Sequence, residues 1–448
     1  MKTDRFSEKY CFLQLLTNLN PRGLYLGIFC CDYCRAIINS MIKRKITPKL
    51  LAALKDSPVV LVHGARQTGK STLVKHLSEN DYPAKYLTFD DPTILSAARS
   101  SPFEFLTNYE DNLVIDEVQR VPEIFLTIKG LVDKERKSGK YILTGSSNVL
   151  LLPKVSESLA GRMEILNLFP FSQNEISGSE YNFIDEIFKK DFKPNIEPKK
   201  KNDLTSRILT GGFPEMLFRK DRLRQEAWFK SYVTTILQRD VRDIVNIEKL
   251  SELPRLLKLL ASRAGTLFNF AELSRSAAIP QTTLKRYISL LEVIFLILPL
   301  PAWSGNLSKR LIKTPKLYLS DTGLLSHLIS FEHDKIVNDP LSWGRIVENF
   351  ILLELLKQSS WSNYNLSLFY FRTSSGQEVD FIIEHSGGSL VGIEVKASAK
   401  VTADNFNHLR VFAEENKKKF LRGFVFYTGA EIIPFAKNLF AMPISTLW

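Results

Sequence analysis

Residues 59–77, VVLVHGARQTGKSTLVKHL, constrain the fold of this chain more than any other stretch. The apolar run at its start has the length and composition of a buried parallel strand. Residues 64–71, GARQTGKS, match the pattern G-x-x-x-x-G-K-[ST], and apolar residues then repeat at helical spacing. A strand, a glycine-containing loop and a helix in this order predict a P-loop, and therefore an α/β fold built on a parallel sheet.

The loop predicts a binding site for ATP and Mg²⁺. Backbone N–H groups of the loop and of the helix N-terminus are suited to bind phosphate oxygens. Lys70 is expected to reach the β- and γ-phosphates, and the Ser71 hydroxyl to ligate Mg²⁺. The residues expected to bind the nucleotide are Gly64, Ala65, Arg66, Gln67, Thr68, Gly69, Lys70, Ser71 and Thr72.

A second stretch, NLVIDEVQ at 112–119, is expected to supply the carboxylates of the same site. Its apolar residues predict a buried strand with Asp116 at the carboxyl end, where open α/β sheets bind their ligands. Asp116 is expected to hold the Mg²⁺, and Glu117 to activate the attacking water, which points to hydrolysis of ATP. The alternative is an acidic pair that stabilises the start of a helix through the helix dipole.

Two further stretches offer candidates for the same site. YILTGSSN at 141–148 predicts a buried strand that ends in Ser146, Ser147 and Asn148, any of which could contact the γ-phosphate or the attacking water. This strand resembles the sensor strand of AAA-type ATPases. Arg162 is a candidate arginine finger, acting in cis or across subunits, and the alternative is a surface or structural arginine.

Six stretches occur in a characteristic order: GARQTGKST, LTFDDP, LVIDEVQRVPEIF, ILTGSSN, LAGR and GGFPE. From about Met41 to the C-terminus the chain resembles AAA-type P-loop ATP-binding proteins of bacteria and archaea that carry a C-terminal domain of unknown function. The resemblance implies an ATP site with Mg²⁺. Thr68 departs from it, because most members have an apolar residue there. The first forty residues fall outside the resemblance, and we expect a poorly ordered extension.

The middle of the chain predicts a winged-helix-like module. Residues 268–292 have the spacing of a helix-turn-helix, and 293–320 offer two strands around SGN that would form a wing. The net charge of +12 fits a polyanionic partner, and we expect nucleic acid, with DNA favoured. The alternative is a module that only bridges the other domains. The basic residues suited to phosphate contacts are Lys285, Arg286, Lys309, Arg310 and Lys313.

The last hundred residues predict a helix, three strands, a helix and a strand, which is the core order of the PD-(D/E)XK nuclease-like fold. Glu348 is expected on the first helix, Asp380 on the second strand, and Glu394 and Lys396 on the third. Side chains alternate along a strand, so Glu394 and Lys396 share one face. Asp380 and Glu394 are expected to bind Mg²⁺, and Lys396 to orient or deprotonate a water that attacks a phosphodiester. The alternative is an ion pair that stabilises a fold that no longer cuts.

The sequence therefore predicts a Mg²⁺-dependent ATPase that acts with nucleic acid and carries a nuclease-like C-terminal domain. The alternative is a nucleotide-dependent regulatory or scaffold protein whose inactive C-terminal domain binds a protein partner. All four cysteines lie in the first 34 residues and no apolar run spans a bilayer, so we expect a cytoplasmic protein without membrane contact. A homo-oligomer is compatible with the resemblance. The expected divisions are an extension (1–40), the ATPase core (41–180), a linker and helical region (181–265), the winged-helix-like module (266–330) and the nuclease-like domain (338–448).

Overall fold

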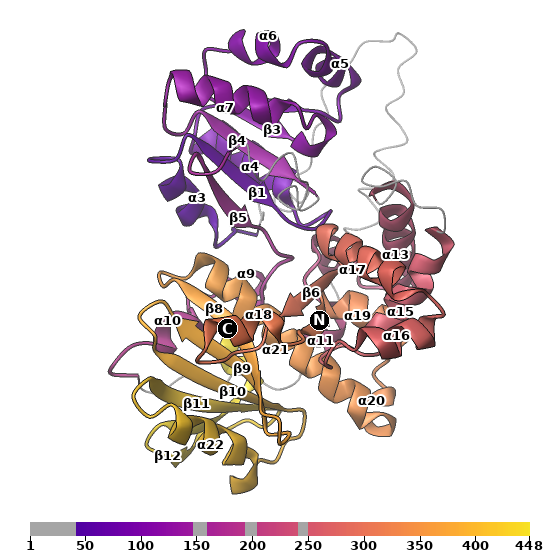
Figure 1. The fold of residues 1–448 in the computed structure, drawn as a ribbon, viewed down its shortest axis with the longest axis vertical. Helices are drawn as coiled ribbons and strands as arrows, with labels where there is room; N and C mark the ends of the chain where they lie inside the picture. Colours follow the sequence, from indigo (N-terminus) through magenta and orange to yellow (C-terminus); the bar gives the residue numbers. More distant parts are fainter. Residues whose placement is uncertain (1–41, 147–158, 193–203, 241–249) are drawn as a thin grey trace, which may run out of the picture. The chain divides into compact units, whose positions relative to one another are not determined.

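The computed structural model describes residues 42–146, 159–192, 204–240 and 250–448 (Figure 1). The predicted extension and the sensor candidates Ser147 and Asn148 lie outside these ranges. Within them, no helix is long and apolar enough to cross a membrane.

The first part is a parallel sheet with helices on both faces. Its strands are β1 (Val59–His63), β2 (Lys85–Thr88), β3 (Leu113–Asp116), β4 (Tyr141–Gly145) and β5 (Met163–Asn167), in the order β2-β3-β4-β1-β5. The helices are α3 (Thr47–Ala53), α4 (Lys70–Asn80), α5 (Pro92–Ser100), α6 (Pro102–Thr107) and α7 (Ile124–Lys134). This arrangement confirms the predicted α/β fold with a parallel sheet.

Successive side chains of β1 point to opposite faces of the sheet, and helices cover both faces. Val59 and Leu61 join a cluster with residues of α5, α6 and α7, whereas Val60 and Val62 join a second cluster with residues of α3 and α4. All four side chains are fully buried. A continuous apolar strand is therefore stable here, because each face of the sheet is covered.

The middle of the chain is mostly helical. It contains α9 (Gln173–Ser177), α10 (Phe183–Ile187), α11 (Leu204–Thr210), α12 (Pro214–Phe218), α13 (Arg222–Thr235), α15 (Leu253–Ala261), α16 (Phe270–Ala277), α17 (Gln281–Val293), β6 (Ile297–Leu300), α18 (Leu307–Ile312), β7 (Lys316–Leu319), α19 (Thr322–Leu328) and α20 (Lys335–Asn338). The two predicted helices are α16 and α17. The two predicted strands, β6 and β7, pair antiparallel, but α18 lies between them, so they are not joined by the short wing loop expected around SGN.

The C-terminal part begins with a long helix, α21 (Pro340–Trp361), and contains a mixed sheet. The predicted order of helix and strands is present, followed by two strands that the sequence did not predict, β12 and β13. The sheet has the order β12-β13-β11-β10-β9-β8. Its elements are β8 (Leu366–Arg372), β9 (Glu378–His385), β10 (Leu390–Lys396), α22 (Asn407–Glu415), β11 (Phe420–Tyr427), β12 (Ile433–Ala436) and β13 (Leu439–Pro443).

One hydrophobic cluster contains side chains from Phe183 to Trp448, so it includes both the helical middle and one face of the C-terminal sheet. The other face of that sheet packs on α22 in a separate cluster. The predicted boundaries at 265/266 and 330/338 therefore do not separate independent cores.

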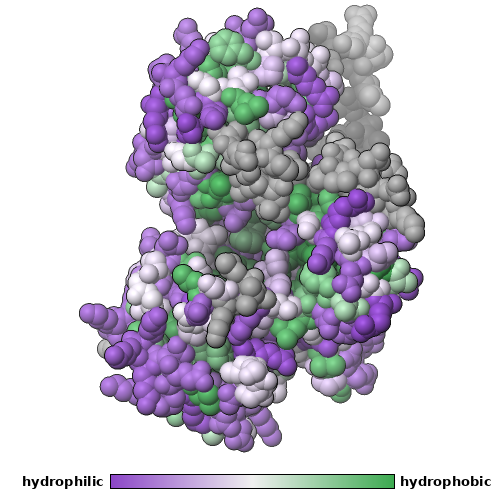
Figure 2. All heavy atoms as spheres, viewed as in Figure 1, coloured by the Kyte–Doolittle hydropathy of each residue, from purple (hydrophilic) through white to green (hydrophobic). Residues whose placement is uncertain are grey.

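On the face seen in Figure 2, polar residues cover most of the lower C-terminal part, and apolar residues form smaller patches.

Candidate nucleotide site and carboxylate cluster

The P-loop connects β1 to α4 in the conformation that its glycines allow. Gly69, just before α4, has a φ of 92°, in the left-handed region that favours glycine. Lys70 is the first residue of α4, and its ammonium donates to the backbone oxygens of Gly64 (2.9 Å) and Ala65 (2.8 Å). Thr68 is fully buried, and its hydroxyl donates to the oxygen of Ala65 (3.0 Å). These bonds hold the loop curled around the lysine ammonium.

Asp116 is held at the carboxyl end of β3 by hydroxyl groups from three elements. The Ser71 hydroxyl lies 3.0 Å from Oδ1, and the Tyr86 hydroxyl lies 2.9 Å from Oδ2. The Thr144 hydroxyl also donates to Oδ1. Burial and Asp116 itself raise the pKa of Tyr86, so this phenol stays a donor. Ser71 and Asp116, which the sequence predicts as Mg²⁺ ligands, are thus neighbours, and oxygen donors of this kind suit Mg²⁺.

Sequence analysis missed Tyr86 and Thr144, because each appears in the sequence as an ordinary strand residue. Parallel register brings them to Asp116: Thr88 of β2 lies opposite Asp116, and Leu143 of β4 lies opposite Ile115. Side chains near the carboxyl ends of neighbouring strands therefore converge, which only the strand order decides.

Glu117 follows β3 in an unusual backbone conformation, with a φ of 60°. Its backbone N–H donates to the Thr144 hydroxyl (3.1 Å), and its carboxylate accepts from the Ser146 hydroxyl (2.9 Å). Gln119, a further residue that the sequence did not single out, donates to the Glu117 carboxylate and to the Ser146 hydroxyl (2.9 Å). The structure thus brings together Glu117 and Ser146, which the sequence assigned to one site.

A cavity of about 550 Å³ lies beside the P-loop. The residues from the predicted site that line it are Arg66, Gln67, Gly69, Lys70, Ser71, Thr72 and Glu117. Its other wall belongs to the helix α13, including Trp228 and Tyr232, whose rings are stacked. The Tyr232 hydroxyl donates to the backbone oxygen of Arg66 (3.3 Å). This volume falls in the usual range for small-molecule sites, and Lys70 and Glu117 both line it.

Arg162 lies at the other end of this sheet. It directly precedes β5, which runs parallel to β1. The carboxyl ends of the two strands lie side by side at His63 and Asn167, so Arg162 lies near their amino ends. The Arg162 guanidinium forms an ion pair with Asp133, with Nη2 3.1 Å from Oδ2. An arginine finger acting in cis does not fit this placement, because the P-loop lies beyond the opposite ends of the strands. A role across subunits stays a prediction.

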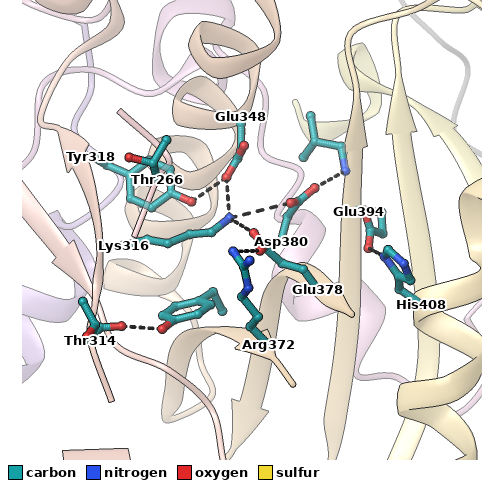
Figure 3. A network of polar contacts seen from close by, with 12 residues as sticks. Thr266, Thr314, Lys316, Tyr318, Glu348, Arg372, Glu378, Asp380, Glu394 and His408 are labelled. Atoms are coloured by element: carbon teal, nitrogen blue, oxygen red, sulfur yellow. Dashed lines mark hydrogen bonds and ion pairs between the residues drawn. The ribbon is translucent and has the colours of Figure 1, made fainter. Parts of the chain in front are cut away.

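The C-terminal carboxylates gather around a lysine that sequence analysis did not single out (Figure 3). Lys316 of β7 places its ammonium 3.1 Å from Glu348, 2.5 Å from Glu378 and 3.8 Å from Asp380. The Tyr318 hydroxyl donates to the same oxygen of Glu348 (2.6 Å). Burial, with Asp380 nearby, raises the pKa of Glu348 to about 7. Burial alone would lower the pKa of Lys316, but the surrounding carboxylates raise it.

Glu394 and Lys396 form a pair of their own on β10. The Lys396 ammonium lies 3.3 Å from one carboxylate oxygen of Glu394, and the His408 ring lies 3.8 Å from the other. Asp380 turns one oxygen to the backbone N–H of Val395 (2.8 Å). Burial and then Asp380 raise the pKa of Glu394 well above its ordinary value.

The C-terminal residues do not fit a metal ion as they stand. Among the residues that the structure describes, no group of three or more His, Cys, Asp or Glu side chains is placed to hold one. The ammonium of Lys316 lies between Glu348 and Asp380, and Glu394 is paired with Lys396 instead. The predicted Mg²⁺ site at Asp380 and Glu394 therefore stays a prediction.

The basic residues predicted to contact phosphates have different environments. Lys285 and Arg286 are exposed on α17, as a phosphate contact requires. Arg310 is not available, because its guanidinium binds Glu384, with Nη2 3.0 Å from Oε1. Lys313 is exposed, but its ammonium donates to the backbone oxygen of Arg372 (3.2 Å). The side chain of Lys309 lies outside the described residues.

The sheet order, the P-loop and the Ser71–Asp116 pair define a P-loop NTPase of the AAA type. Three family models match the chain: an AAA domain over residues 56–177, and domains of unknown function over 201–335 (DUF8612) and 343–447 (DUF4143). An uncharacterized protein of Mycobacterium tuberculosis is 30% identical over 358 residues, covering 80% of this chain and 74% of its own. The chain therefore belongs to this family of AAA-domain proteins with a C-terminal domain of unknown function.

The chain is also similar to an archaeal protein over most of its length. An uncharacterized protein of Methanocaldococcus jannaschii is 26% identical over 395 residues, covering 82% of each chain. Among solved structures, the RuvB Holliday junction branch migration motor of Thermotoga maritima aligns with 56% of this chain and 88% of its own, at 17% identity and a TM-score of 0.26. A TM-score this low supports no inference about this chain. The winged-helix and nuclease-like assignments stay predictions, because the matching domains are of unknown function.

Proposed function

We propose that this protein is a Mg²⁺-dependent ATPase whose turnover is coupled to binding of nucleic acid. The observation that carries the proposal is the position of Glu117: its carboxylate lines the cavity beside the P-loop, one residue after Asp116, and is oriented by Ser146 and Gln119. A P-loop that only bound ATP would not need an oriented carboxylate at this place. Glu117 is suited to be the general base for an attacking water.

Each residue of the nucleotide site has its own role in the proposed hydrolysis of ATP. Lys70 would leave the loop oxygens and bind the β- and γ-phosphates, and Ser71 and Asp116 would hold the Mg²⁺. The ion would supply charge neutralisation at the phosphates. Glu117 takes a proton from water at its carboxylate as the water oxygen bonds to the γ-phosphorus and the bond to the β–γ bridging oxygen breaks. The products are ADP and phosphate.

Exposed basic residues support the nucleic-acid part of the proposal. Lys285 and Arg286 lie on α17, the second helix of the predicted helix-turn-helix, and their side chains are exposed. The whole chain carries a net charge of +12. Binding through such residues releases counterions, so the affinity for DNA should fall steeply as the salt concentration rises.

The test is steady-state ATP hydrolysis by the purified chain, with and without DNA. Lys70→Ala should abolish turnover, and Glu117→Gln should lower kcat by at least about a hundredfold while ATP still binds. The exposed Lys75→Ala on the same helix is the matched control and should leave turnover unchanged. Double substitution of Lys285 and Arg286 by alanine should remove stimulation by DNA but keep the basal rate. Wild-type protein that binds ATP without hydrolysing it would contradict the ATPase.

A second candidate is a nucleotide-dependent regulatory or scaffold protein whose C-terminal domain does not cut nucleic acid. It is favoured by Lys316, whose ammonium occupies the space between Glu348 and Asp380. Incubation of wild-type protein with DNA or RNA, ATP and Mg²⁺ or Mn²⁺ tests whether the C-terminal domain cuts nucleic acid. Cleavage that Asp380→Ala and Lys396→Ala both remove would establish the nuclease predicted from the sequence. Intact nucleic acid under all these conditions would support the second candidate.

A further inference from the structure

The carboxylate cluster at the start of β9 contains a cation that comes from a different part of the chain. Lys316 belongs to β7, whereas Glu348 comes from α21 and Asp380 and Glu378 from β9. Figure 3 shows the lysine side chain extending between them, with its ammonium at the centre of the carboxylates. The Lys316 side chain is 3% exposed, so bulk water does not replace these contacts.

A second cation, Arg372, adds to the positive charge at this cluster. The Arg372 guanidinium lies 3.0 Å from the second oxygen of Glu378, and its side chain is 43% exposed. Two cations thus face three carboxylates, and the Tyr318 hydroxyl donates to one of them. A buried ammonium without such partners would be strongly destabilising, and three half-buried carboxylates without a cation would repel one another.

A divalent ion could not share this space with the lysine. Like charges a few ångströms apart repel strongly in a buried site. The ammonium of Lys316 faces one oxygen of Glu348 and one of Glu378, so an ion bound to Asp380 would have to compete with it for these oxygens. Glu394, the other predicted ligand, has one oxygen at Lys396. Its second oxygen is buried, accepts no hydrogen bond from the residues that the structure describes, and lies 3.8 Å from the His408 ring.

We propose that the ammonium of Lys316 is the resident cation of this cluster, in the place that a divalent metal would take, and that it joins β7 to α21 and β9. The cluster is then a metal-independent joint between the helical middle and the C-terminal sheet. This inference does not depend on the ATPase proposal, because it uses none of the residues at the P-loop.

The test is Mn²⁺ binding followed by electron paramagnetic resonance and calorimetry. Every variant carries Asp116→Asn, so that the P-loop contributes no metal site, and no nucleotide is added. The chain with Lys316 intact is expected to show no saturable binding at millimolar Mn²⁺ that depends on Asp380. Saturable binding that Asp380→Asn removes would overturn the proposal. This measurement decides the proposal even if no Lys316 variant folds.

Substitution of the lysine gives the complementary result. Lys316→Met replaces the lysine stem by an unbranched apolar chain one atom shorter and removes the charge. It should give an Mn²⁺ site with at least about tenfold higher affinity than the parent chain, because the carboxylates then lack the lysine cation. Adding Asp380→Asn to this variant should remove the new site. The exposed Lys313→Met is the matched control and should bind no more Mn²⁺ than the parent. A folded Lys316→Met chain that gains no Mn²⁺ binding would count against the proposal.

Discussion

His63, the last residue of β1, is a buried titratable side chain directly before the P-loop. It is 3% exposed, and its ring packs edge-on against Phe295, with ring centroids 5.3 Å apart. Burial, with a further contribution from Lys70, lowers the pKa of His63 to about 4. The imidazole is therefore neutral in the folded chain at pH 7, and its protonation opposes folding.

The pKa of His63 predicts how stability depends on pH. The unfolded chain binds a proton at this histidine below about pH 6.5, but the folded chain does so only below about pH 4, so stability falls as the pH drops through that window. Between pH 7 and pH 5 the loss should be about 2 kcal/mol. Urea unfolding at the two pH values should show this contribution disappear in His63→Met. The exposed His76→Met is the control and should retain the full loss.

Gly212, in the glycine pair of GGFPE, lies directly against two other segments of the chain, at Phe171 and at Asp321. The N–H of Gly212 donates to the Asp321 carboxylate (2.7 Å), and the same carboxylate caps α19 by accepting from the N–H of Leu324 (3.0 Å). A Cβ on Gly212 would lie 2.2 Å from the backbone oxygen of Phe171. The pair is therefore needed because three backbone segments meet without room for a side chain.

Gly212→Ala should destabilise the chain by about 3 kcal/mol, because backbone has to move away from the new methyl group. Gly130→Ala is the matched control: Gly130 lies within α7, and nothing lies within 4 Å of an added Cβ. That variant should be more stable by about 0.5–1 kcal/mol. Thermal unfolding of both variants beside the wild type measures the two effects. Equal stability of the two variants would contradict this account of the glycine pair.

In the whole molecule, the long helix α21 packs in the same hydrophobic cluster as the middle helices and one face of the C-terminal sheet. Its buried residues Ile346, Val347 and Phe350 lie in the cluster that also contains apolar residues of α10, α15 and α17. Polar groups reinforce the connection: the backbone N–H of Gln173 donates to Glu354 of α21 (2.8 Å). The C-terminal sheet therefore does not have a complete core without the helical middle.

A fragment of residues 338–448 should not fold cooperatively, because it would expose the face of α21 that packs on the middle helices. We expect a broad thermal transition and binding of a hydrophobic dye, as in states that have lost specific packing. The fragment 42–448, which contains every cluster, is the control and should unfold in one sharp transition. A cooperative transition of the short fragment would show that the predicted boundary near residue 338 separates a self-sufficient domain.

Features whose residues are contiguous or periodic could be predicted from the sequence. The P-loop, the strand that ends in Asp116, and the order of helix and strands after residue 340 all follow from local spacing, because backbone geometry links spacing to direction. The match to an AAA domain covers the first two of these stretches. These parts of the fold were predicted with their bounds within a few residues.

Which charged and polar side chains meet could not be predicted from the sequence, because it depends on how distant segments pack together. Thr144 and Tyr86 hydrogen-bond to Asp116 because their strands lie beside β3. Arg310 forms an ion pair with Glu384, and Lys316 forms ion pairs with carboxylates more than thirty positions away in the sequence. A buried charge must find a partner, but its partner can come from any element that packs beside it. Spacing along the chain does not predict these partners, because packing between distant segments determines which side chains meet.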